Sequence, residues 1–311
     1  MNKVIIILGP TGVGKTGFSI LLAKALHTEI ISADSMLVYR YMDIGTAKPS
    51  VKELKAVPHH LINILSPSET FSAGQFKERA TEIIDSLHSQ NKIPIIVGGT
   101  GLYIRSLTKG LFEGPGADDS LRKMLQAEAN KKGSGHLYNK LTAVDPDAAQ
   151  NIDKNDIRRL IRAIEVSLKS RKGISELRRQ STHSLHYDFI KIGLIRDRKE
   201  LYPMIEQRVD RMMQSGLLEE TKQLLTFSPG KTALQALGYK EIRLHLHEEV
   251  DLNESVRLIK KRTKEYAKRQ HTWFRKEPDI DWVDITGIHN SREMYTTVLH
   301  KVEILKELIY S

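Results

Sequence analysis

A glycine-rich turn close to the amino terminus constrains the fold of this 311-residue chain more than any other segment. Residues 9–16 read GPTGVGKT, which matches the pattern GxxxxGK(S/T) of a phosphate-binding loop. Such a loop joins a buried strand to a helix. Here the aliphatic run Val4–Leu8 precedes the turn, and a helical pattern over residues 16–27 follows it. The segment therefore predicts a site for a ligand that carries a pyrophosphate group.

The backbone and the side chains of this loop have different expected roles. Its glycines allow N–H groups to converge on phosphate oxygens, and the helix amino terminus adds partial positive charge. Lys15 supplies a mobile cation, and the Thr16 hydroxyl is suited to help hold Mg²⁺. Thr11 fits a turn residue and a hydroxyl beside a leaving-group oxygen equally well. We expect the whole loop to bind pyrophosphate: Gly9, Pro10, Thr11, Gly12, Val13, Gly14, Lys15 and Thr16.

Strand-like and helix-like segments alternate along the first third of the chain. Short apolar runs typical of buried strands occupy residues 4–8, 29–33, 61–65 and 93–97, and helical patterns occupy 16–27 and 76–90. This alternation predicts an α/β fold, in which a parallel sheet is covered by helices on both faces. With the phosphate loop after its first strand, the sheet is expected to be P-loop NTPase-like.

The pattern changes after residue 110. The Gly-Pro-Gly break at 114–116 is followed by helical periods up to about residue 181. Asp145-Pro146 reads as a helix start, residues 156–169 as a helix, and residues 187–195 as a strand that returns to the sheet. We therefore expect a core of residues 1–112 and 187–311, interrupted by an all-helical insertion at 113–186. Long helices are expected at about 198–226, 253–276 and 291–310.

Composition narrows the classes of function. The chain has no cysteine, which excludes disulfide scaffolds, cysteine-ligated metals and thiol catalysis. Its net charge is +10, and nine Lys/Arg residues lie within each of the segments 154–179 and 257–276. Solvated helix faces explain either basic run alone, but two such runs beside a phosphate loop favour a nucleic acid partner. No apolar run approaches the roughly 20 residues of a membrane helix, so we expect a cytoplasmic protein without a membrane partner.

Two further polar residues follow predicted strands. Asp34 ends the run at 29–33, and Thr100 lies in the turn Gly98-Gly-Thr-Gly101. The carboxyl ends of parallel strands meet at one edge of a sheet, so both residues are expected beside the phosphate loop. Asp34 fits a general base, a Mg²⁺ carboxylate or a helix cap. Thr100 fits a ligand contact or an ordinary tight turn.

Taken together, these segments resemble the tRNA dimethylallyltransferase (tRNA isopentenyltransferase) family, bacterial type, nearly end to end. The segments that carry the resemblance are GPTGVGKT at 9–16, ISADSMLVYRYMDIGTAKP at 31–49, PHHLINILSPSETFSAGQF at 58–76, PIIVGGTGLYI at 94–104, DIRRLIRAIEV at 156–166, IEQRVDRMMQSGLLEE at 205–220, ALGYKEI at 236–242 and KRQHTWFRK at 268–276. The block from Asp34 to Pro49 is far more specific than the phosphate loop.

The resemblance implies a reaction and a set of residue roles. The dimethylallyl group of dimethylallyl pyrophosphate would pass to the N6 amine of adenosine 37 in tRNA, with Mg²⁺ as cofactor. Asp34 would act as general base, while Thr11 and Arg208 would complete the catalytic set by stabilising the departing pyrophosphate. The tRNA contacts would be Asp34, Ser35, Met36, Leu37, Thr100, Arg122, Lys123, Arg158, Arg159, Leu160, Ile161 and Arg162. The insertion and the 257–276 run would grip the anticodon stem-loop, and we expect a monomer.

Three alternative functions fit part of the same sequence. A small-molecule P-loop kinase or NTPase would use Asp34 for Mg²⁺ and would turn over ATP. An adenylate isopentenyltransferase would accept a free nucleotide, which needs neither an insertion nor basic runs. A non-catalytic RNA-binding protein would not need Thr11, Lys15, Asp34 and Arg208 together.

Overall fold

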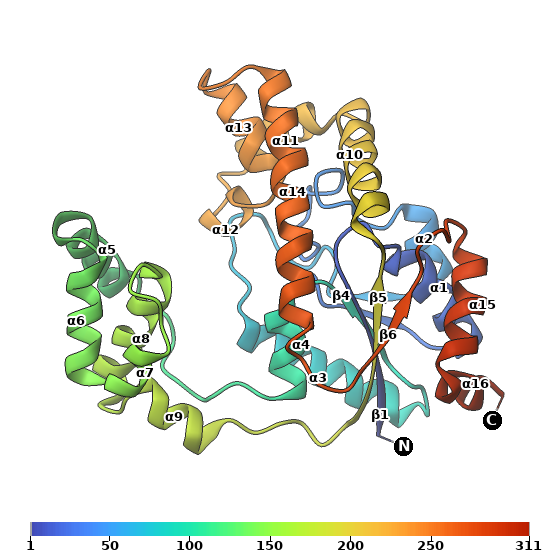
Figure 1. Ribbon diagram of the computed structural model, residues 1–311, viewed down its shortest axis with the longest axis horizontal. Helices are drawn as coiled ribbons and strands as arrows, with labels where there is room; N and C mark the ends of the chain where they lie inside the picture. Colours follow the sequence, from blue (N-terminus) through green and yellow to red (C-terminus); the bar gives the residue numbers. More distant parts are fainter. Residues whose placement is uncertain (1, 311) are drawn as a thin grey trace. The chain divides into compact units, whose positions relative to one another are not determined.

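The computed structural model describes residues 2–310 and divides the chain into two compact units. The first unit comprises Met1–Ile104 and His186–Ser311, and the second comprises Arg105–Leu185. Figure 1 shows the elements of each unit. Among the described residues, no helix is both long enough and apolar enough to span a membrane.

Six strands form one sheet in the first unit. They are β1 (Lys3–Leu8), β2 (Ile30–Ser32), β3 (His59–His60), β4 (Ile95–Gly98), β5 (Asp188–Ile195) and β6 (Ile280–Asp284). Their order is β3-β2-β4-β1-β5-β6, and all the pairings are parallel. The predicted parallel sheet is confirmed, and so is the predicted return of the chain to it at β5, which pairs with β1.

Helices make up most of the remaining regular structure in both units. In chain order they are α1 (Lys15–Ala25), α2 (Val51–Ala56), α3 (Ala73–Ser89), α4 (Gly101–Thr108), α5 (Asp119–Lys132), α6 (Ser134–Val144), α7 (Pro146–Gln150), α8 (Ile157–Ser170), α9 (Ile174–Ser181), α10 (Arg198–Gln214), α11 (Leu217–Thr226), α12 (Lys231–Leu234), α13 (Tyr239–Leu246), α14 (Leu252–Phe274), α15 (Ser291–Lys301) and α16 (Glu303–Tyr310).

The central strand β1 is buried on both faces, which explains its unbroken aliphatic sequence. Ile5 and Ile7 pack in one cluster with Phe18 of α1 and Val298 of α15. The alternating residues, among them Ile6, point to the opposite face because successive strand side chains alternate, and they are equally buried. Helices therefore cover both faces of the sheet, as an all-parallel sheet requires.

The predicted position of the third strand was wrong. Residues 61–65 were expected to form it, but the strand is His59–His60, and Leu65 makes only an isolated bridge to Tyr39. Leu61 and Asn63 have φ angles of 61° and 57°. These left-handed conformations interrupt the extended backbone that a strand needs.

In the structure, two of the expected long helices are each divided into two shorter helices. The segment 198–226 is divided into α10 and α11 at Gly216, whose φ of 97° lies outside the helical region. The segment 291–310 is divided into α15 and α16 at Val302, which has φ −119° and ψ 84°. The strand β6 was not predicted, because its sequence IDWVD contains two exposed acidic residues.

The second unit is helical and has its own core. Helices α5–α9 lie within it, and α7 begins as expected, with Pro146 in its first turn and Asp145 accepting a hydrogen bond from the Ala148 N–H. The unit runs from Arg105 to Leu185, whereas the insertion was expected at 113–186. Leu160 and Ile161, which were predicted to contact tRNA, are buried in its core.

A buried carboxylate ties helices α5 and α8 of this unit together. The Glu165 side chain is fully buried and accepts hydrogen bonds from Arg122 (2.8 and 2.9 Å) and Arg162 (2.6 Å). It also accepts from the backbone N–H of Asp118 at 2.7 Å. Burial alone would raise the pKa of Glu165, but these hydrogen bonds outweigh burial and lower it. The two arginines were predicted to contact tRNA, and the structure gives them this internal partner.

We predict that Glu165→Gln lowers the free energy of unfolding by about 2 kcal/mol, because the new amide group places donors against existing donors. Since the folded pKa lies below the unfolded one, the contribution of Glu165 is present above the unfolded pKa and lost as pH falls. Urea titration near pH 7 measures the loss. Glu176→Gln is the matched control: its carboxylate pairs at the surface with Lys172, and little change is expected. Equal effects of the two substitutions would contradict the assignment.

Candidate active site

Three neighbouring strands bring the predicted site residues to one edge of the sheet. In the order β2-β4-β1, the loop after β2 carries Asp34, the loop after β4 carries Thr100, and the loop after β1 is the phosphate loop at 9–16. Because the strands are parallel, all three loops leave at the carboxyl edge, where ligands bind in open α/β sheets.

Close packing explains the glycines of the phosphate loop. Gly14 has a φ of 107° and caps α1, a conformation that side chains disfavour. At Gly9 a Cβ would lie 2.5 Å from the backbone oxygen of Leu194 in β5. The loop is thus pressed against the next strand, and it leads directly into the amino terminus of α1, where anions bind favourably.

Lys15 folds back over the loop. Its Nζ donates to the backbone oxygens of Gly9 at 3.0 Å and Pro10 at 2.9 Å. Burial lowers its pKa to about 8, an effect that the Asp34 carboxylate opposes and the Arg208 guanidinium reinforces. The lysine therefore lies close enough to both residues to respond to their charges, and it is a cation held without a full counter-charge.

Arg208 reaches the phosphate loop from α10. Its Nη2 donates to the Thr11 hydroxyl oxygen at 2.8 Å. Burial lowers the pKa of Arg208, and the nearby Asp34 carboxylate opposes the shift. Since the Thr11 oxygen accepts this bond, the hydroxyl proton remains available for another acceptor. The structure thus brings together the three predicted catalytic residues, Thr11, Asp34 and Arg208. Thr11 and Arg208 are 197 positions apart in the sequence.

Asp34 lies in a turn, not at a helix. Its Oδ1 accepts from the Met36 N–H at 2.9 Å, and the next helix begins only at Val51, so the helix-cap alternative was wrong. Thr100 supports the same turn by accepting from the Ser35 N–H at 3.1 Å. The predicted contact residues Ser35, Met36 and Leu37 are all partly exposed.

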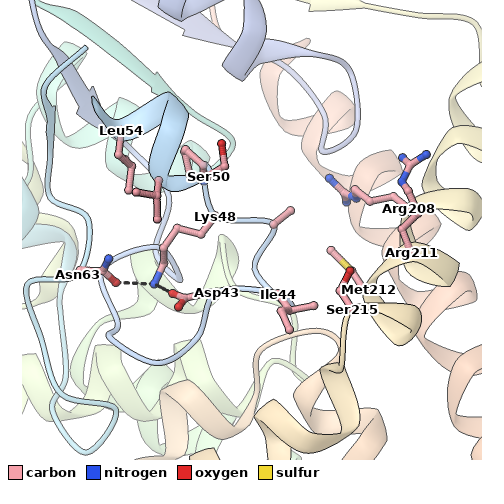
Figure 2. A pocket seen from close by; sticks show the side chains of 13 residues that line it. Asp43, Ile44, Lys48, Ser50, Leu54, Asn63, Arg208, Arg211, Met212 and Ser215 are labelled. Carbon is pink, nitrogen blue, oxygen red and sulfur yellow. Dashed lines mark hydrogen bonds and ion pairs between the residues drawn. The ribbon is translucent and has the colours of Figure 1, made fainter. Parts of the chain in front are cut away.

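A cavity of about 410 Å³ lies beside Arg208. Figure 2 shows Arg208 and Arg211 on one side of it and Ser50 and Leu54 on the other. The lining combines cationic and apolar groups: Asp43, Ile44, Ala47, Lys48, Pro49, Ser50, Val51, Leu54, Asn63, Arg208, Arg211, Met212 and Ser215. Positive and apolar surface in one cavity suits a ligand with an anionic head and a short hydrocarbon tail.

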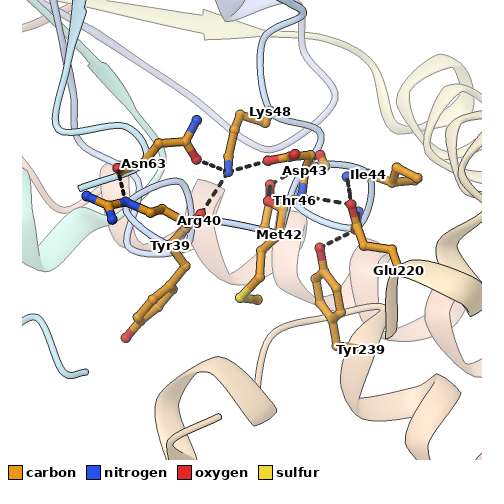
Figure 3. Close-up of polar contacts among 11 residues, drawn as sticks. Tyr39, Arg40, Met42, Asp43, Ile44, Thr46, Lys48, Asn63, Glu220 and Tyr239 are labelled. Carbon is orange, nitrogen blue, oxygen red and sulfur yellow. Dashed lines mark hydrogen bonds and ion pairs between the residues drawn. The ribbon is translucent and has the colours of Figure 1, made fainter. Parts of the chain in front are cut away.

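A second carboxylate, which the sequence did not reveal, holds the loop that lines this cavity. Glu220 of α11 accepts hydrogen bonds from the backbone N–H groups of Asp43, Ile44 and Gly45 at 2.9–3.0 Å, and from the Tyr239 hydroxyl at 2.6 Å. Figure 3 shows these contacts. Glu220 lies inside a segment that carries the family resemblance, but only the folded chain shows which backbone groups its carboxylate meets.

Lys48 closes the same loop from the other side. Its Nζ donates to the Tyr39 backbone oxygen at 2.7 Å and to Asp43 and Asn63 side-chain oxygens at 2.5 Å each. Burial lowers the pKa of Lys48, and the hydrogen bond with Asp43 opposes the shift. Glu220 and Lys48 therefore hold the loop at 43–48 from two sides by hydrogen bonds.

The basic run at 257–276 is not a continuous surface strip. Several of its cations pair with acidic side chains inside the first unit: Lys260 with Asp210 at 2.7 Å, Arg262 with Glu241 at 2.7 Å, and Lys264 with Glu206. These three cations therefore help to hold α14 against α10 and α13. The other six basic residues of the run are exposed: Arg257, Lys261, Lys268, Arg269, Arg275 and Lys276.

The predicted contact residues of the second unit divide by exposure. Lys123, Arg158 and Arg159 are exposed. Arg159 also pairs with Asp156 at 3.3 Å, beside the start of α8. These three cations remain the candidates for a phosphate backbone.

The described residues, 2–310, contain no cluster of three or more His, Asp or Glu side chains that would hold a metal. The Thr16 hydroxyl stands in the first turn of α1 beside the phosphate loop. Mg²⁺ typically takes few protein ligands when it binds with a phosphate ligand and water. A single hydroxyl is therefore a donor set that fits Mg²⁺ carried by a pyrophosphate.

Known proteins resemble the chain over nearly all its length. A family model described as IPP transferase matches residues 37–277. A tRNA dimethylallyltransferase of Thermodesulfovibrio yellowstonii is 51% identical, covering 100% of this chain and 97% of the relative. One from Alkaliphilus metalliredigens is 43% identical and covers 97% of both chains.

Solved structures of proteins of the same kind also resemble the chain. A full-length tRNA isopentenylpyrophosphate transferase from Bacillus halodurans superposes with a TM-score of 0.71 at 40% identity and covers 100% of both chains. A eukaryotic dimethylallyltransferase acting on tRNA superposes with a TM-score of 0.83 at 30% identity, covering 98% of this chain and 80% of that one.

We predict that Lys15→Met raises the melting temperature of the ligand-free protein. The folded pKa of about 8 lies below the ordinary value of 10.5, so burial of the protonated amine is unfavourable at neutral pH and this penalty fades as pH rises above 8. The same substitution is expected to abolish the stabilisation by inorganic pyrophosphate. Thermal unfolding with and without pyrophosphate measures both effects. Lys24→Met, at an exposed position of α1, should change neither; a destabilised Lys15→Met protein would contradict the prediction.

Proposed function

The chain belongs to the IPP transferase family, and on this premise we propose that it prenylates the N6 amine of adenosine 37, beside the anticodon. It is an enzyme that transfers a dimethylallyl group to tRNA, and the resemblance predicted from its motifs is confirmed. The observation that supports our proposal most strongly is the hydrogen bond from Arg208 to Thr11, with Asp34 near enough to influence both Arg208 and Lys15.

The acceptor amine needs help because its lone pair is delocalised into the purine ring. In the proposed reaction, N6 attacks the allylic carbon, the bond from that carbon to the pyrophosphate oxygen breaks, and Asp34 accepts the N6 proton. Oδ1 of Asp34 accepts a hydrogen bond from the Met36 N–H, and this bond fixes the orientation of the carboxylate. General-base catalysis of this kind contributes typically about 10²–10⁴-fold.

Negative charge builds on the pyrophosphate as the bond breaks. The loop amides, Lys15, Arg208 and the Thr11 hydroxyl proton are the donors that would meet this charge. Because Lys15 and Arg208 are partly buried, their interaction with an arriving anion would be screened less than on an open surface. Removal of one such donor from an active site costs about 10²–10³-fold in rate.

We propose Mg²⁺ as cofactor, held on the protein side by Thr16. When bound, it would neutralise part of the pyrophosphate charge. The cavity beside Arg208 would admit the donor, because its cations suit the pyrophosphate and its apolar residues, such as Leu54 and Met212, suit the dimethylallyl group. Since all these residues belong to one chain, we propose that the enzyme acts as a monomer. We also propose that it acts in the cytoplasm.

The proposed RNA contacts involve both units. The turn Asp34–Leu37 would receive the target adenosine, which can be extruded from a loop more easily than from a duplex. The exposed cations Lys123, Arg158 and Arg159 would hold phosphates of the anticodon stem-loop. Incubation with dimethylallyl pyrophosphate, Mg²⁺ and unmodified tRNA, followed by nucleoside mass analysis, tests the proposal; parallel incubations with AMP or ATP as acceptor test the rival activities.

We predict that Asp34→Asn lowers kcat by about 10²–10⁴-fold while the Kd for tRNA stays within about twofold. Asparagine preserves the acceptor for the Met36 N–H but removes the basic oxygen. Single-turnover kinetics and a tRNA-binding titration make the measurement. Asp281→Asn, on the exposed part of β6, serves as the control; full turnover by Asp34→Asn would remove the base assignment.

We predict that neutralising Arg158 and Arg159 together, as glutamines, flattens the salt dependence of tRNA binding. Each phosphate contact contributes roughly 0.7–0.9 to the slope of log K against log salt, so the loss of two contacts lowers its magnitude by roughly 1.5. The double substitution of Lys131 and Lys132, exposed at the end of α5, removes the same charge from the same unit and should leave the slope nearly unchanged. Identical slopes in the two variants would place the RNA elsewhere.

A further inference from the structure

One buried amide side chain connects two of the three loops at the site. Gln270, near the end of α14, is 5% exposed. Its Oε1 accepts the Thr11 N–H at 2.8 Å, and its Nε2 donates to the Gly99 backbone oxygen at 2.9 Å. The phosphate loop after β1 and the turn after β4 are therefore bonded to the two ends of a single planar group.

The turn after β4 is shaped to admit this amide. A Cβ on Gly99 would lie 2.1 Å from Nε2 of Gln270, so only glycine allows the contact. Tyr266 lies one helical turn earlier, close to Thr100 and Gln270. Burial raises the pKa of Tyr266, and the Asp34 carboxylate adds to the shift. The same face of α14 thus lies beside the phosphate loop and within the field of Asp34.

Thr11 and Asp34 are connected through Gln270. On one side, Gln270 holds the amide of Thr11, whose hydroxyl is already engaged by Arg208. On the other side, it holds the turn whose Thr100 accepts from the Ser35 N–H, next to Asp34.

Helix α14 is itself fixed against the helix that carries Arg208. Glu206 and Asp210 stand two residues before and after Arg208 on α10, and they pair with Lys264 and Lys260 of α14. Figure 1 shows the two helices side by side, in agreement with their packing. Gln270 therefore extends from an element whose position relative to Arg208 is already determined.

We propose that Gln270 is a positioning residue that sets the separation between the pyrophosphate side of the site, at Thr11, and the base side, at Asp34. This inference rests on the proposed function. An in-line transfer from donor to acceptor depends on the approach of two separately bound substrates, and a misplacement of about 1 Å can cost roughly 10²-fold in rate. The residue touches neither substrate in this role; it aligns the groups that do.

The chemistry of the two contacts explains why an amide is needed. One end must accept from an N–H group and the other must donate to a carbonyl, and glutamine offers both at once. Methionine offers neither. An ionised glutamate would face the Gly99 oxygen with a negative charge, whereas a protonated glutamic acid reproduces both hydrogen bonds.

The test compares Gln270→Met and Gln270→Glu with wild type, using dimethylallyl pyrophosphate and unmodified tRNA. For Gln270→Met we expect kcat to fall about 10–100-fold, with the tRNA Kd and the melting temperature changed no more than in the control. The control is Ser255→Ala, which removes another buried hydrogen bond of α14, from Ser255 to the Glu241 backbone oxygen at 3.0 Å. It should retain wild-type kcat.

A pH profile separates positioning from a general loss of stability. For Gln270→Glu, the ratio of its kcat to that of wild type should rise as pH falls, because protonation restores the donor to Gly99. A flat ratio, or a wild-type kcat in Gln270→Met, would overturn the positioning role while leaving the proposed function intact. If wild type itself transfers no dimethylallyl group to tRNA, the proposed function fails and the positioning role fails with it.

Discussion

Partly buried positive charge at the phosphate loop is the constraint on which the rest of the site depends. Lys15 and Arg208 lie within each other's field, and the Asp34 carboxylate opposes the effect of burial on both. Such an arrangement is unfavourable by itself, because desolvated cations lose their hydration. In the proposed function a pyrophosphate would supply the missing negative charge, and the unfavourable burial of the two cations would then favour its binding. The chain holds these groups in place through contacts that are remote in sequence.

Those contacts come mainly from the last third of the chain. Helix α10 delivers Arg208, α11 delivers Glu220 to the loop at 43–48, and α14 delivers Gln270 to Thr11 and Gly99. In the proposed function the amino-terminal sheet edge would supply Thr11, Lys15 and Asp34, and the carboxyl-terminal helices would align them. A reaction between two separately bound substrates gains most from alignment of this kind, which explains why so much of the structure serves to hold three loops.

Charge in this chain has two uses that composition cannot separate. The run at 257–276 and the run at 154–179 have the same number of basic residues. In both runs some cations pair with acids, as Lys260 does with Asp210 and Arg162 with Glu165, while others, such as Arg158, stay exposed. The difference lies in which acidic side chains the fold brings near, because an internal ion pair leaves less net charge for a polyanion than a solvated arginine does.

The sequence alone determined what depends on local spacing. The phosphate loop, the aliphatic run of β1, the parallel α/β class and the position of Asp34 after a strand all follow from patterns within a few residues, because glycine placement and hydrophobic periodicity are local properties. What could not be predicted from the sequence also has a physical reason. The burial of Leu160 and Ile161 and the partners of Glu165, Glu220 and Gln270 depend on groups brought together from distant segments. Only the tertiary structure decided these, because a hydrogen bond or an ion pair depends on distance in space, and separation along the chain does not specify that distance.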